Sequence, residues 1–140
     1  MGFRTVLILL FLAAFQIYSQ QGELSGRYEV IDAQGVRYYI SGNPQRFCTI
    51  HIVFPRKGEN DEVYYQNSPD DVRAVSEKDC ARIESLFLET VKKAKKISTA
   101  DLKPGFLVLK TSGKTEMYFI KSEQKAFLEI DRYLRSFWIP

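Results

Sequence analysis

The stretch FCTIHIVF, residues 47–54, is the clearest strand signal in the chain. Every second position, from Cys48 to Phe54, is apolar, and alternate residues of a strand point to the same face of a sheet. We therefore expect Cys48 to face the protein core. His51, the only histidine in the chain, should point to the opposite face beside Thr49.

Further strand signals lie on both sides of this stretch. Residues 27–32 and 36–40 read as two strands, and Gly35 between them suits a tight hairpin because glycine accepts a positive φ. After a polar loop, residues 63–65 suggest a short fourth strand, and residues 67–71 form another loop. We expect these strands to pair with their neighbours in an antiparallel sheet.

A long amphipathic helix follows, beginning after Ser76. Its apolar residues recur at spacings of three and four, which places them on one helical face. These residues are Cys80, Ile83, Phe87, Val91, Ala94 and Ile97. Ser76 suits the N-cap position, and the lysines at 92, 93, 95 and 96 complement the dipole at the helix end.

The last third of the chain predicts a second hairpin, from 106–110 and 115–121, and a final helix after Ser122. The element order becomes β-β-β-(β)-α-β-β-α. Adjacent hairpins imply mainly antiparallel pairing, and two amphipathic helices suffice to cover one face of a small sheet. We therefore predict an α+β fold with a mainly antiparallel sheet of about five strands and two helices on one face.

The two cysteines are predicted to form a disulfide. Cys48 lies on the apolar face of its strand and Cys80 on the apolar stripe of the long helix, so both sulfurs point into the same helix–sheet interface. The alternative is two buried free thiols that pack as small apolar groups. The pairing predicts Cα atoms within about 7 Å of each other.

The N-terminus resembles a secretory signal peptide. Residues 6–15 form an unbroken apolar run, which is too short to cross a bilayer and fits a signal peptide that is cut after Ser19. We expect a signal peptide over residues 1–19, a single α+β domain over 20–140, and a secreted or periplasmic location with no transmembrane segment after cleavage. An uncut membrane anchor is the alternative.

Several function classes lack sequence support. The formal net charge of +3 does not predict nucleic-acid binding. A single histidine cannot supply an ordinary zinc site by itself, and no serine lies in a Gly-x-Ser-x-Gly turn. The acidic loops lack the spacing of a calcium-binding loop. We therefore assign no catalytic residue, metal ligand or cofactor from the sequence.

The remaining candidate for function is the sheet face away from the helices. We predict a binding surface there from Arg37, Tyr39, His51 and Tyr118, with Tyr64 or Tyr65 beside them, because tyrosine and arginine are common in recognition surfaces. The first hypothesis is a non-enzymatic module that binds another protein or a surface polymer. The alternative is a small extracytoplasmic hydrolase with a site of scattered carboxylates and tyrosines.

Overall fold

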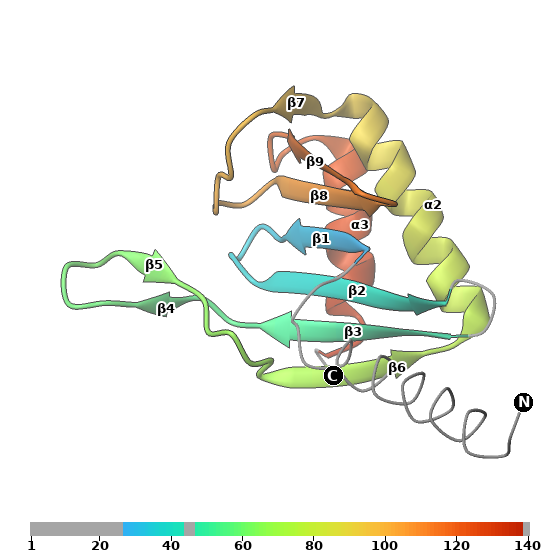
Figure 1. Cartoon of the computed structure of the whole chain (residues 1–140), viewed down its shortest axis with the longest axis horizontal. Helices are drawn as coiled ribbons and strands as arrows, with labels where there is room; N and C mark the ends of the chain where they lie inside the picture. Colours follow the sequence, from blue (N-terminus) through green and yellow to red (C-terminus); the bar gives the residue numbers. More distant parts are fainter. Residues whose placement is uncertain (1–26, 44–46, 139–140) are drawn as a thin grey trace, which may run out of the picture.

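The computed structural model describes residues 27–43 and 47–138. The predicted signal peptide, its cleavage site after Ser19 and residues 20–26 lie outside these ranges. Seven strands of the described chain form one antiparallel sheet in the order β6-β3-β2-β1-β8-β9-β7 (Figure 1). They are β1 (Tyr28–Ile31), β2 (Arg37–Asn43), β3 (Phe47–Val53), β6 (Asp71–Val75), β7 (Lys95–Ile97), β8 (Phe106–Thr111) and β9 (Lys114–Phe119). The two helices are α2 (Glu77–Lys93) and α3 (Lys125–Arg135).

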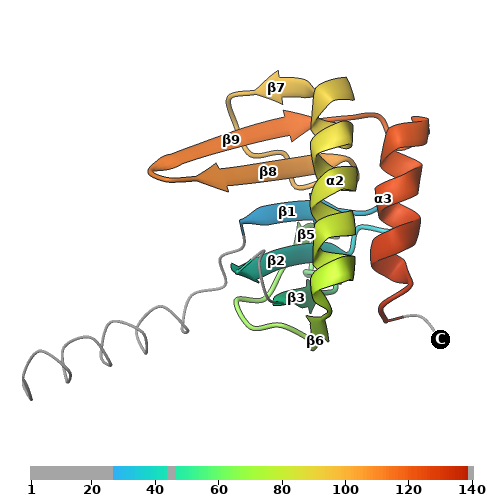
Figure 2. The same cartoon turned by 90° about the vertical axis from the view of Figure 1, so that its right-hand side faces the viewer.

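Both helices lie on the same side of the sheet, as Figure 2 shows in a view from the right-hand side of Figure 1. The main core fills the space between these layers, with apolar side chains from β1, β2, β3 and both helices. Among them, Ile50, Phe87 and Ile130 are fully buried. The predicted α+β fold with two helices on one face is confirmed, and the sheet has seven strands instead of about five.

The additional strands come from segments that the sequence analysis assigned differently. The long helix ends at Lys93, because the chain becomes extended at Ala94 and pairs with β9 as strand β7. Ile97, expected on the helical stripe, packs instead with a second apolar cluster on the other face of the sheet. Strand β6 follows the predicted loop and pairs with β3, so it forms one edge of the sheet.

The expected short fourth strand exists but does not belong to this sheet. It is β5 (Val63–Tyr64), which pairs with β4 (Arg56–Lys57) in a separate hairpin. We call residues 56–64 the arm, because this hairpin projects from one end of the sheet in Figure 1. Asp70 fixes the end of the arm that adjoins the sheet. The Asp70 carboxylate accepts a hydrogen bond from the Phe54 backbone N–H at 2.7 Å and pairs with Arg56 at 2.8 Å.

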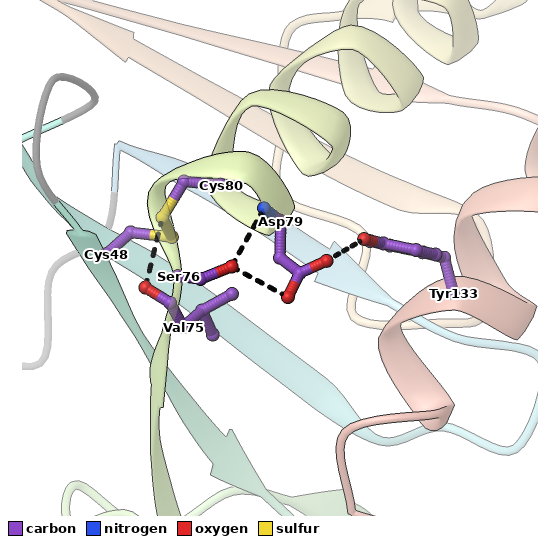
Figure 3. The surroundings of a disulfide bond; sticks show 6 residues. All are labelled: Cys48, Val75, Ser76, Asp79, Cys80 and Tyr133. Carbon is purple, nitrogen blue, oxygen red and sulfur yellow. Dashed lines mark hydrogen bonds between the residues drawn. A yellow bond between two sulfur atoms is a disulfide. The ribbon is translucent and has the colours of Figure 1, made fainter.

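The predicted disulfide is confirmed. Cys48 on β3 and Cys80 on α2 are bonded, with their Cα atoms 5.8 Å apart. Figure 3 shows the bond beside the start of α2, where the Ser76 hydroxyl accepts a hydrogen bond from the backbone N–H of Asp79. The Asp79 carboxylate in turn accepts a hydrogen bond from Tyr133 of α3 at 2.6 Å. The first turn of α2 is therefore bonded both to the sheet and to the other helix.

A fully buried carboxylate joins the β1–β2 turn to the C-terminal end of α3. Asp32 accepts hydrogen bonds from the backbone N–H groups of Gln34 and Val36 and from the Tyr38 hydroxyl, at 2.8 to 2.9 Å. The Tyr38 oxygen accepts a hydrogen bond from the Trp138 indole N–H at 2.6 Å. Within the same turn Gly35 has φ +84°, as the hairpin prediction required.

Candidate binding surface

The sheet face away from the helices, which we call the open face, is organised around one row of cross-strand neighbours. The registers place Tyr39 beside both Glu29 and His51, and His51 beside Val72. The same row continues from Glu29 through Val108 to Met117 and reaches Ile97 at the far edge. Polar and aromatic side chains therefore occupy the middle of this face, and apolar side chains lie toward both edges.

A charged cluster lies at the centre of the open face. The carboxylate of Glu29 pairs with the guanidinium of Arg37 and with the ammonium group of Lys110, each at 3.0 Å. The Arg37 guanidinium carbon also lies 4.8 Å from the centroid of the Tyr39 ring and 5.5 Å from that of Tyr65. Two cations surround one anion, so the cluster carries a net positive charge.

Tyr65 reaches this cluster from the segment after the arm. Its hydroxyl donates a hydrogen bond to the backbone carbonyl of Gly35 at 2.7 Å, which fixes the ring against Arg37. Tyr65 therefore fulfils the expectation that one of the two tyrosines, 64 or 65, joins Tyr39. Tyr64 instead lies on the arm, where its residue is 47% exposed, beside Val63 at 50%.

The cluster is more buried than the sequence analysis expected. Tyr39 is only 8% exposed, and the Arg37 side chain is 16% exposed. Burial raises the pKa of both Tyr39 and Tyr65 and lowers that of His51, so His51 is neutral at pH 7. The expectation of an exposed Tyr39 ring is wrong, because the Arg37 side chain packs against it.

Tyr118 is the candidate residue that the structure places elsewhere. It pairs with Leu107 of the main core and packs against that core on the helix side, so its predicted position on the open face is wrong. Strand β9 has apolar residues on both faces, and alternation alone did not decide its orientation. The Tyr118 hydroxyl donates a hydrogen bond to Glu116 at 3.0 Å.

The structure thus brings together Arg37, Tyr39 and His51 from the predicted set, with Tyr65 as the tyrosine expected beside them. It adds two residues that sequence reasoning missed, Glu29 and Lys110. A signal for Glu29 was present, because it is the one charged residue between the apolar positions of β1. An isolated charge inside a buried strand usually has a charged partner, and here that partner is Arg37.

Two other polar sites are too enclosed to take a ligand larger than water. The Asp32 carboxylate is fully buried and already accepts three hydrogen bonds. A cavity of about 20 Å³ beside the disulfide, lined by Tyr28 and Glu84, has room for one water molecule. In residues 27–43 and 47–138, no three His, Cys, Asp or Glu side chains cluster closely enough to hold a metal ion.

No helix within the described ranges is both long enough and apolar enough to cross a bilayer. The chain matches no family model, no curated protein and no solved structure.

Proposed function

We propose that this chain is an exported, non-enzymatic binding module that contacts another protein or a surface polymer through the open face and the adjoining arm. The observation that carries this proposal is the arrangement of the open face. A preordered Arg–Tyr cluster occupies its centre, and the partly exposed side chains of His51 and Val72 continue the row from Tyr39 toward β6.

The physical properties of this surface suit recognition. Arg37 is held by Glu29 and by two tyrosine rings, so little side-chain entropy remains to be lost when a partner binds. The net positive charge of the cluster favours a partner with carboxylate or other hydrogen-bond-accepting groups. Tyr64 and Val63 on the arm add exposed aromatic and apolar area beside it.

The disulfide supports the part of this proposal that concerns export. A disulfide is stable in an oxidising compartment and rare in a reducing one, and the bond between Cys48 and Cys80 is consistent with an extracellular location. A signal peptide over residues 1–19 with cleavage after Ser19 is the proposed route. N-terminal mass analysis of the exported protein tests this step, and recovery of intact Met1 in a membrane fraction would contradict it.

The hydrolase alternative has weaker support. Burial raises the pKa of both Asp32 and Tyr38, but these groups lie inside the core, where their hydrogen bonds are made with neighbouring protein groups. Glu29, the buried carboxylate of the open face, is paired with two cations. A general acid or base needs access to a substrate proton, and neither carboxylate has it in this arrangement.

The test compares variants of the exported protein in affinity capture from the medium or periplasm in which it resides. Tyr64→Ala and His51→Ala remove side chains from the proposed surface, and Leu128→Ala is the control, because Leu128 is a 40% exposed apolar residue on α3. We expect one protein or polymer to be captured by the wild type and by Leu128→Ala, and to be lost with the other two variants. Equal capture by all four proteins would refute the proposed surface.

A further inference from the structure

Strand β6 forms an edge of the sheet along which no other strand of residues 27–43 and 47–138 pairs. It is the terminal strand of the seven, with β3 on one side, and Figure 1 shows no described element beyond it. The backbone N–H of Val72 donates to the side chain of its neighbour Asp71 at 2.8 Å, so this N–H points away from β3. Backbone groups alternate in direction along a strand, and Ala74 therefore presents its N–H and C=O to the same outer side.

The side chains of this edge carry opposite charges in a fixed order. Asp71 and Arg73 lie opposite Ile52 and Ile50 of β3, on the helix side of the sheet, and form an ion pair at 2.9 Å. Both side chains are more than a third exposed. Val72 between them lies on the open face and is 47% exposed, although its strand neighbour His51 is half-buried.

This order is self-complementary. When two copies of β6 meet in antiparallel orientation about a two-fold axis at Val72, the two Val72 residues face each other and exchange two backbone hydrogen bonds. Asp71 of each copy then lies opposite Arg73 of the other, which gives two reciprocal ion pairs. Opposite charges directly across an antiparallel pair stabilise it, and like charges destabilise it. A shift of the axis to Arg73 would place the two arginines opposite each other, so the charges select the register at Val72.

We propose that the chain forms a homodimer through β6, with Val72 on the two-fold axis. The contact is isologous, as closed dimers require. In the dimer, the Val72 N–H donates to the backbone of the second copy instead of to the Asp71 side chain. The Asp71 carboxylate then pairs with Arg73 of the second copy. Two sheets become one continuous sheet, and the two open faces lie side by side. This inference rests on the β6 edge alone and stands independently of the proposed function.

The decisive experiment uses complementary charge variants of the exported chain in analytical ultracentrifugation. Asp71→Arg leaves two cations at the edge, and Arg73→Asp leaves two anions. We expect wild-type protein to sediment as a dimer, each variant alone to sediment as a monomer, and an equimolar mixture of the two to recover the dimer. Glu129→Lys is the control, because Glu129 lies in an exposed ion pair with Lys125 on α3. This control should remain dimeric.

A cysteine experiment tests the register and stays informative if a charge variant fails to fold. In a hydrogen-bonded antiparallel pair the Cα atoms are about 5.5 Å apart, within the range of a disulfide. Val72→Cys should therefore crosslink two copies under mild oxidation. Ala74→Cys lies on the same face of the same strand, but in this register the two copies of position 74 are about 13 Å apart along the strands and should not crosslink.

Three results would overturn the proposal. They are a monomeric wild type at all accessible concentrations, dimers that persist in both charge variants, and a variant mixture that stays monomeric. Preferential crosslinking by Ala74→Cys or Arg73→Cys would overturn the register. Occupation of the edge by residues 20–26 of the same chain would appear as a monomer in which Val72→Cys forms no intermolecular disulfide, and it would equally refute the dimer.

Discussion

Removal of the buried carboxylate of Asp32 should destabilise the fold strongly. In Asp32→Ala, the Val36 N–H and the Tyr38 hydroxyl lose their acceptor inside the core, whereas the Gln34 N–H lies where water replaces it. Each orphaned buried donor costs about 1–3 kcal/mol, so the free energy of unfolding should fall by about 2–6 kcal/mol. A protein of this kind has about 5–15 kcal/mol in total, and the loss is therefore a large fraction of its stability.

Tyr38→Phe tests the same contact from its other end. The substitution removes the donor to Asp32 and the acceptor of the Trp138 indole, and should cost about 1–3 kcal/mol. Because both single substitutions break the same hydrogen bond, the double variant should lose less stability than the sum of the two, by about 0.5–3 kcal/mol. Asp101→Ala, in an exposed ion pair with Lys103, is the control and should change stability by less than about 0.5 kcal/mol.

Urea unfolding provides the measurement, with far-UV circular dichroism as the global signal. Trp138 is the only tryptophan of the chain, and its indole belongs to this network, so its fluorescence reports on the same contact locally. A loss below about 1 kcal/mol in Asp32→Ala would refute the account, because even one orphaned buried donor costs about that much. Additive effects of the two substitutions would equally show that Asp32 and Tyr38 do not act as a pair.

Two further measurements address the disulfide and a surface carboxylate. Cys48→Ala combined with Cys80→Ala releases a loop of about 33 residues and should lower the free energy of unfolding by about 3.7 kcal/mol in urea titrations, and a loss below about 1 kcal/mol would show that the bond adds little. Glu116 is held by Lys114, Lys96 and Tyr118, which lower its pKa from 4.5 to about 2, so the stabilisation from these contacts should be present above pH 4.5 and disappear as the pH falls toward 2. Side-chain NMR should show this titration, and in Lys114→Ala the pKa should rise; an unchanged value in that variant would contradict the assignment.

The parts of the fold that the sequence predicted correctly depend on simple periodicity. From Cys48 to Ile52, strand β3 alternates between apolar and polar residues, and the stripe of α2 from Cys80 to Phe87 has helical spacing, so the helix–sheet interface and the disulfide followed from these two patterns. Periodicity gave a wrong prediction where an apolar pattern continues past the end of the helix. Ile97 keeps the helical spacing of α2, but hydrogen bonding to β9 moves it into β7 and to the opposite face.

The candidate site was only partly predictable for a related reason. Alternation within β2 and β3 placed Tyr39 and His51 on the open face, because one side of each strand is clearly more apolar. Strand β9 has Met117 and Phe119 on one face and Tyr118 on the other, so apolar content does not distinguish its two faces. Tyr65 joins Arg37 only through the path of the segment after the arm, and that tertiary contact has no local sequence signal.

The pairing of β1 with β8 has a consequence for the order in which the protein can assemble. β1 lies in the middle of the sheet, and one of its two neighbours is β2, close in sequence, whereas the other is β8, from the distant half of the chain. A ribosome or a membrane channel that delivers the chain from its N-terminus therefore presents β1, β2 and β3 with one side of β1 still unpaired. The second side of β1 is paired only after residues 106–111 have emerged, and pairing between such distant segments is slow. The chain therefore stays incompletely folded during synthesis for longer than a protein whose strands pair only with their sequence neighbours.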